Sequence, residues 1–265
     1  RLHDKNIYVI GRISVFQDPI LAKAHPEWAL ISSSTGKLWE DRKGLFWMDP
    51  ASEPVWDYNI SIAKDAFRRG FDEVNFDYIR FASDGDLKNI KYPAWDEKSL
   101  KSTVIKNFFS YLRKNLPEAK ISADLFGLAT VNYDGLGIGQ IIENAYDYFD
   151  FVSPMVYPSH YASGFIGYKN PAEYPYEVIR YSLDKALSRL ENYSSSTNLK
   201  VSLKSKLRPW LQDFDLGATY GPEMVRKQIQ AVEDSLNSAS SSLAFAGWLL
   251  WDPSNVYTAA ALKNQ

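Results

Sequence analysis

The stretch FDEVNFDYIRF at residues 71–81 has the pattern of a β-strand that places acidic and amide side chains on one face. Side chains alternate between the two faces of a β-strand, so Glu73, Asn75 and Asp77 share one face, while a valine, a phenylalanine and a tyrosine share the other. Burying an unpaired polar group costs on the order of 2–7 kcal/mol, and a charge costs more, unless partners or water satisfy it. We therefore expect this strand to line a functional cleft.

Composition favours one large α/β domain over residues 1–265. The chain has 265 residues, 45% of them hydrophobic and 15% aromatic, which suffices for the core of a (β/α)8 barrel. A net charge of -2 leaves no basic stripe for nucleic acid. The longest apolar runs, such as Leu243–Trp251, are too short to span a membrane.

Several kinds of chemistry have no support in the sequence. There is no cysteine for a disulfide or a thiol nucleophile, and the three histidines do not follow the spacing of metal ligands. The glycines at residues 135–139 lack the spacing of nucleotide-binding loops. We therefore expect neither a metal nor a cofactor.

Strand and helix patterns alternate along the chain, which predicts parallel strands joined by helices. The expected strands are Ile7–Phe16, Asp72–Arg80, Ile121–Phe126, Phe151–Tyr157, Ser205–Phe214 and Leu243–Trp251. The expected helices are Glu53–Arg69, Glu97–Leu116, Ile138–Phe149, Pro175–Leu190, Pro222–Leu236 and a short one at Ser254–Leu262. Roughly six βα units are visible, whereas a closed barrel has eight. The fold class is thus a TIM-like barrel, and we expect its first two units upstream of an N-terminally truncated chain.

Three segments are expected to be loops. Gln17–Asp49 is a long connection that carries three tryptophans, and such long loops are often functional. Asn192–Asn198 and Ser235–Ser242 are polar and predict surface loops.

Two aspartates are the candidate catalytic residues. Asp77 and Arg80 come at the end of one expected strand and Asp124 lies in the next, and barrel active sites form at the C-terminal strand ends. Glycoside cleavage uses two carboxyl groups, ~5–5.5 Å apart for retention and ~6.5–9.5 Å apart for inversion. The alternative is a purely structural ion pair between Arg80 and one of the acids. We expect Glu73, at the strand start, to be structural and Asn75 to orient a neighbour.

Aromatic and amide side chains at later strand ends are candidates for substrate binding. Tyr157 and His160 can hydrogen-bond sugar hydroxyls, although they could equally form a rigid proline-bounded turn. Trp210 and Trp251 can stack on the apolar faces of sugars, and Gln212 can bind their hydroxyls. Single tryptophans usually belong to a core, but several at strand ends favour carbohydrate.

Together these segments resemble a family of bacterial glycosyl hydrolases of largely unknown substrate, related to the amylase-like barrels. The similar motifs are residues 7–12, Trp56–Asn59, 71–81, Ser122–Gly127, Ser153–Tyr161, Arg208–Gln212 and Gly247–Trp251. The resemblance implies that Asp77 ends the fourth strand as nucleophile and that Asp124 on the fifth is the acid/base. It also implies an extracytoplasmic or secreted protein.

Two positions depart from the related patterns. The acid/base position holds an aspartate where amylase-like barrels usually have glutamate, and Ala82 stands where the family usually has proline. Chitinase-like barrels also have a similar strand, but their catalytic glutamate would fall on Ile79, which argues against their mechanism.

The sequence therefore predicts a glycoside hydrolase that acts on a polysaccharide or oligosaccharide, with a retaining mechanism and with Arg80 keeping Asp77 ionised. The alternative is a non-catalytic carbohydrate-binding or cell-wall-associated barrel. A third hypothesis is that the barrel is only a scaffold for other domains.

Overall fold

The computed structural model describes residues 1–196, 205–238 and 245–262. The chain divides into two compact units. Unit 1 comprises Arg1–Asp124 and Tyr133–Asp150, and unit 2 comprises Leu125–Asn132 and Phe151–Gln265. The expectation that residues 1–265 form one domain stays a prediction.

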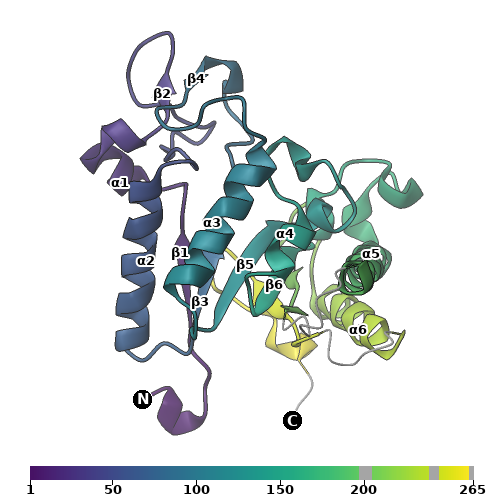
Figure 1. Cartoon of the computed structure of the whole chain (residues 1–265). Coiled ribbons are helices and arrows are strands. Elements are labelled where there is room, and N and C mark those ends of the chain that lie inside the picture. Colours follow the sequence, from purple (N-terminus) through teal and green to yellow (C-terminus); the bar gives the residue numbers. More distant parts are fainter. Residues whose placement is uncertain (197–204, 239–244, 263–265) are drawn as a thin grey trace. The chain divides into compact units, whose positions relative to one another are not determined.

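Unit 1 is built on three parallel strands with β3 in the middle. They are β1 (Ile10–Ser14), β3 (Glu73–Asp77) and β5 (Ile121–Phe126), and Figure 1 shows them side by side. The register places Ser14 opposite Asp77 and Asn75 opposite Ser122. All five residues of β3 are buried. Strand β3, with its polar face, therefore lies in the interior of the unit.

Helices and a small two-stranded antiparallel sheet complete unit 1. They are α1 (Pro19–Ala24), α2 (Glu53–Arg68), α3 (Lys101–Asn115), α4 (Ile142–Tyr146) and the antiparallel pair β2 (Ile31–Ser32) and β4 (Ile90–Lys91). Helix α2 follows Ser52 in an extended conformation, has a proline in its first turn, and buries Val55, Ile60 and Ala63. It ends before Gly70, whose φ of +91° suits glycine.

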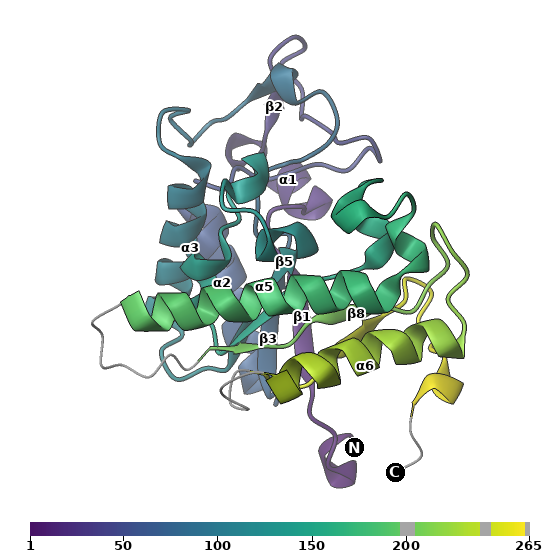
Figure 2. The same ribbon diagram turned by 90° about the vertical axis from the view of Figure 1, so that its right-hand side faces the viewer.

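The described residues of unit 2 form four parallel strands and two long helices. The strands are β6 (Phe151–Met155), β7 (Lys206–Leu207), β8 (Trp210–Gln212) and β9 (Leu249–Trp251); β6 pairs with β7 and β8, and β8 pairs with β9. Helices α5 (Pro175–Ser196) and α6 (Pro222–Ser238) pack against each other, as Figure 2 shows.

Unit 2 also contains a very close approach at Gly127. A Cβ at Gly127 would lie 2.5 Å from the carbonyl oxygen of Met155 and 2.6 Å from the hydroxyl of Tyr161. Tyr161 is itself buried, and its hydroxyl lies 2.8 Å from that of Ser182 on α5. Only glycine fits between these groups.

The expected fold class, a TIM-like parallel α/β arrangement with about six strands, is confirmed. Helix α3 begins later than expected because Asp96 accepts hydrogen bonds from the amides of Lys98 and Ser99, while Glu97 has a φ of +56°. The expected strand 205–214 is two strands, interrupted at Arg208 and Pro209. Proline has no N–H to continue the ladder.

Other boundaries also differ from expectation. The loop predicted at Asn192–Asn198 is wrong for its first five residues, because α5 continues to Ser196. The loop predicted at Ser235–Ser242 is likewise wrong for its first four residues, because α6 continues to Ser238. The remainders of both loops and residues 243–244 lie outside the described residues. Helix α4 is shorter than expected, the long connection contains α1 and β2, and the C-terminal helix is a single 3-10 turn, Ala259–Ala261.

Candidate active site

The polar face of β3 lies against the polar residues of β5, as the alternation predicted. Asn75 Nδ2 donates to Asp124 Oδ1 at 2.8 Å and to Ser122 Oγ at 2.9 Å. Asp77 and Asp124 are 3% and 1% exposed, so both carboxyl groups depend on protein partners for their stability.

Arg12, which was not predicted as a site residue, contacts both aspartates. Arg12 lies on β1; its Nη2 forms an ion pair with Asp77 Oδ2, and its Nε lies 3.8 Å from Asp124 Oδ2. Burial lowers the pKa of Arg12, but the charges of Asp77 and Asp124 outweigh this effect, and its pKa is raised overall. Arg12 is the sole cation in the strand expected at Ile7–Phe16, which was the available signal.

Arg80 makes its hydrogen bonds in the loop after β3. Its Nη1 donates to the carbonyl of Phe81 at 3.0 Å and to Ser83 Oγ at 3.1 Å, and its guanidinium lies 4.7 Å from the ring centre of Trp47. Burial lowers the pKa of Arg80, although Asp77 is among the nearby charges that oppose this shift. Arg80 thus adds positive charge to the region, while Arg12 is the arginine that hydrogen-bonds Asp77.

The backbone is strained at the end of β3. Tyr78 has a φ of +53°, which is uncommon for a bulky residue and costs of order 1–3 kcal/mol. Its N–H donates to Asp77 Oδ1 at 2.6 Å. This left-handed residue ends the strand directly after Asp77 and helps to fix that carboxylate.

A second polar layer lies one step back along the strands. Ser122 Oγ donates to Glu73 Oε1 at 2.5 Å, and the hydroxyl of Tyr8 donates to Glu73 Oε2 at 3.1 Å. Asn75 Oδ1 is buried and has no hydrogen-bond partner among the described residues. Glu73 is therefore part of the same network as Asp124.

In unit 2, Tyr157 and His160 come together with Phe214. The ring of Tyr157 lies 5.3 Å from that of His160 and 5.6 Å from that of Phe214, both edge-on. His160 Nδ1 lies 3.0 Å from Ser159 Oγ. The segment from Pro158 to His160 is a 3-10 turn with proline at its start.

Gln212 ends β8 and Trp251 ends β9, whereas Trp210 is the first residue of β8. Gln212 is fully buried; its Oε1 accepts from the Ser159 amide at 3.2 Å and its Nε2 donates to the Phe214 carbonyl at 2.9 Å. Gln212 thus joins the loops after β6 and β8. The rings of Trp210 and Trp251 meet edge to face at 6.0 Å, and both side chains are partly exposed.

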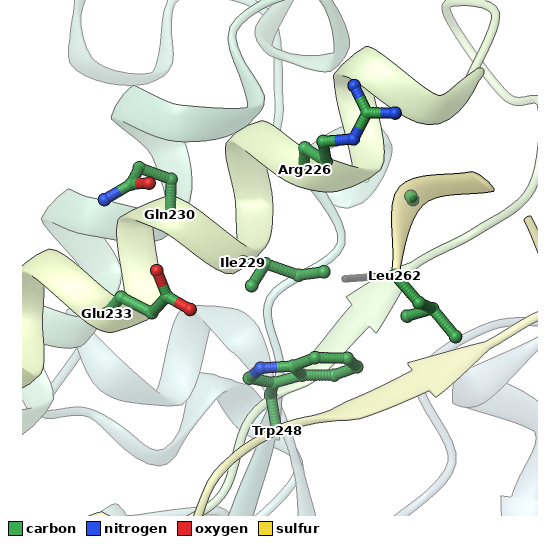
Figure 3. A pocket seen from close by; sticks show the side chains of 7 residues that line it. Arg226, Ile229, Gln230, Glu233, Trp248 and Leu262 are labelled. Carbon is green, nitrogen blue, oxygen red and sulfur yellow. The ribbon is translucent and has the colours of Figure 1, made fainter. Parts of the chain in front are cut away.

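A cavity of about 560 Å³ lies beside α6 in unit 2 (Figure 3). It is lined by Arg226, Ile229, Gln230, Glu233, Trp248, Ala261 and Leu262. Another cavity, of about 910 Å³, lies in unit 1 around Trp39 and Asn89. Neither includes Asp77 or Asp124. Among the described residues no group of three or more His, Cys, Asp or Glu side chains could hold a metal ion.

Parallel strands alternating with helices, and two buried carboxyl groups on adjacent strands, define a barrel-type protein with the fold of glycoside hydrolases. Residues 1–257 match the family described as "Putative glycosyl hydrolase domain". The chain belongs to this family, and the resemblance seen in the motifs is confirmed.

Solved structures share the fold. The glycoside hydrolase domain of PgaB (BpsB) from Bordetella bronchiseptica aligns with a TM-score of 0.57 at 14% identity, over 93% of this chain and 71% of that one. The α-galactosidase TtGalA from Thermus thermophilus, in complex with stachyose, aligns with a TM-score of 0.51 at 12% identity, over 98% and 49%.

A nearer sequence relative is a hypothetical protein from Ruminiclostridium thermocellum ATCC 27405. It is 42% identical over 46% of this chain and 60% of that one, with a TM-score of 0.42. The chain thus spans less than two thirds of that relative. No curated protein sequence matches the chain. None of the described helices is long and apolar enough to cross a membrane.

Proposed function

We propose that the protein is a glycoside hydrolase that cleaves a polysaccharide or oligosaccharide with Asp77 and Asp124 as its two catalytic carboxyl groups. The observation that carries the proposal is that one guanidinium, that of Arg12, lies within ion-pair distance of both buried side chains. Glycosidases hold their two catalytic carboxyl groups ~5–5.5 Å apart for retention and ~6.5–9.5 Å apart for inversion, and a shared ion-pair partner brings two carboxyl groups into the same neighbourhood.

The charge balance of this group suits acid/base catalysis. Two ionised aspartates and one arginine carry a net charge of -1, and uptake of one proton makes the group neutral. Like charges in one buried site disfavour full ionisation, so one carboxyl holds a proton. Asp77 has the shorter contact with Arg12 and also accepts from the Tyr78 amide, so we assign the proton to Asp124.

The proposed reaction is retaining. A carboxylate oxygen of Asp77 attacks the anomeric carbon as the bond to the leaving oxygen breaks, and Asp124 transfers its proton to that oxygen. Asp124 then removes a proton from water, which displaces Asp77 from the sugar. Arg12 stays charged throughout and stabilises whichever aspartate is ionised.

The other predicted site residues are assigned to the substrate. The sequence predictions that Arg80 in unit 1, and Tyr157, His160, Trp210 and Trp251 in unit 2, bind sugar through hydrogen bonds and stacking are kept as part of the proposal. Gln212 would act by holding the loops that carry His160 and Phe214, because its amide is already bonded to them.

The test is a screen of the purified protein against a panel of polysaccharides with detection of new reducing ends. On any substrate that is cleaved, Asp77→Asn should lower kcat by about three orders of magnitude or more. Asp65→Asn is the control, because Asp65 lies on α2 and pairs there with Arg68 and Arg69. Turnover by Asp77→Asn at the rate of the control would remove Asp77 from the mechanism.

The alternative is a barrel that binds carbohydrate without cleaving it. It is favoured by the partly exposed Trp210 and Trp251 pair and by Trp248, whose indole borders the cavity in Figure 3. In that case Trp210→Ala would weaken binding to an immobilised polysaccharide, Asp77→Asn would leave it unchanged, and no reducing ends would appear with any substrate.

A further inference from the structure

A chain of hydrogen bonds connects Glu73 to the proposed acid/base residue. Glu73 accepts from Ser122, the Ser122 oxygen accepts from Asn75, and Asn75 donates to Asp124 Oδ1. Glu73, Ser122, Asn75 and Asp124 are each 0–1% exposed. Buried groups of this kind have few alternative partners, so each hydrogen bond restricts the next.

The direction of these bonds follows from the number of protons available. A serine hydroxyl has one proton, and Ser122 uses it at 2.5 Å on Glu73 Oε1. Its oxygen can then act only as an acceptor toward Asn75. The Asn75 side chain must therefore turn its Nδ2 to Ser122, since its Oδ1 would place lone pair against lone pair.

This orientation of the Asn75 amide determines which of its atoms hydrogen-bonds Asp124. The second proton of Asn75 Nδ2 points at Asp124 Oδ1, at 2.8 Å, so that oxygen acts as an acceptor. The other oxygen, Oδ2, faces the Arg12 Nε at 3.8 Å. Asn75 Oδ1 is left without a partner in the described part of the chain. The arrangement leaves that buried oxygen unsatisfied while both protons of the amide are used.

We propose that Glu73 and Ser122 are positioning residues which fix the amide of Asn75, and that this amide directs the transferable proton of Asp124 to Oδ2. The proposal rests on the proposed function, in which Asp124 is the acid/base. The charged groups linked to Asp124 include Arg12 from β1, which also pairs with Asp77, and, through Asn75 and Ser122, Glu73.

Replacing Ser122 with alanine should release the amide. Without the serine oxygen, Asn75 can rotate and offer Oδ1 to Asp124, an orientation that favours the protonated carboxyl and gives Oδ1 a partner. The titration midpoint of Asp124 should then rise by about one pH unit. Ser122→Thr retains the hydroxyl and should restore the midpoint of the unmodified protein.

The primary measurement needs no substrate. Protein labelled with ¹³C at the aspartate carboxyls is titrated by NMR, and the Asp124 signal is assigned from its loss in Asp124→Asn. Ser153→Ala is the matched control, because Ser153 is a buried serine in β6 whose hydroxyl has no hydrogen-bond partner among the described residues. An Asp124 midpoint in Ser122→Ala equal to that in Ser153→Ala would overturn the proposal. That comparison decides even if Ser122→Thr does not fold.

A second measurement separates this inference from the proposed function. On an active substrate, the basic limb of the kcat profile should shift upward in Ser122→Ala and not in Ser153→Ala. If Asp77→Asn abolishes turnover while Ser122→Ala has an unchanged profile, only the positioning role fails. If Asp77→Asn remains active, the two-aspartate mechanism fails, while the NMR result still tests the hydrogen-bonded chain.

Discussion

Replacing Arg12 with methionine tests the electrostatic basis of the site. Methionine keeps much of the aliphatic bulk but removes the charge that Asp77 and Asp124 share. Breaking a buried ion pair costs about 3–5 kcal/mol because it leaves an uncompensated charge in the interior. The Arg12 side chain is 38% exposed, so solvent screens part of the loss, and we expect a destabilisation of about 2–3 kcal/mol at pH 7.

The loss should depend on pH in a defined direction. The raised pKa of Arg12 means that its stabilising charge is fully present across the neutral and acidic range and disappears only as the pH rises through that raised value. Any change between pH 7 and pH 4 must therefore come from the carboxyls. In the variant no positive charge offsets the carboxylate that stays ionised, so its protonation in acid relieves part of the loss, and the deficit should shrink to about half or less at pH 4.

The assay is urea unfolding of both proteins at pH 7 and pH 4. Arg69→Met is the matched control, since Arg69 pairs with Asp65 on the surface of α2 at 2.6 Å with 72% of its side chain exposed. That pair should contribute no more than about 0.5 kcal/mol. A loss in Arg12→Met no larger than the control's, or one that is the same at both pH values, would refute the assignment of Arg12.

Three further predictions concern stability and are checked by urea unfolding. Gly127→Ala should lower the stability by about 1–3 kcal/mol, because its Cβ would collide with the carbonyl and the hydroxyl that flank it. Gly221→Ala is the control and should be neutral, because there is open space around Gly221. Equal effects of the two substitutions would contradict the prediction. Gln228→Leu should lower the stability by about 1–3 kcal/mol, because Gln228 hydrogen-bonds both the N–H and the carbonyl of Gln212, at 2.8 and 2.7 Å. A near-neutral result would show that these backbone groups find other partners. Burial raises the pKa of Asp49, and its hydrogen bonds to backbone amides offset this only in part. The stability that Asp49 contributes is thus present below about pH 3.9 and lost as the pH rises through the raised pKa. The stability of Asp49→Asn relative to the parent protein should therefore increase between pH 3.5 and 6.5. A stability difference between the two proteins that stays constant over this range would contradict the prediction.

The order of the strands and helices, and the polar face of β3, could be predicted from the sequence. Period-2 alternation sends Glu73, Asn75 and Asp77 to one side whatever the rest of the chain does. The same rule selected Asp124 on the next strand. Boundaries were less well predicted where a local hydrogen bond competed with helix propensity, as at Asp96, or where polar residues continued a helix, as in α5.

The contact of Arg12 with both aspartates could not be predicted from the sequence. Arg80 is three residues from Asp77, but the left-handed Tyr78 turns the chain, and two hydrogen bonds of Arg80 go to the following loop. Arg12 is far away in sequence and reaches Asp77 because β1 pairs with β3 in a register that no local pattern encodes. Strand pairing depends on contacts between residues far apart in the sequence. The charged partner of a buried residue can therefore come from the adjacent strand of the sheet and not from adjacent residues in the chain.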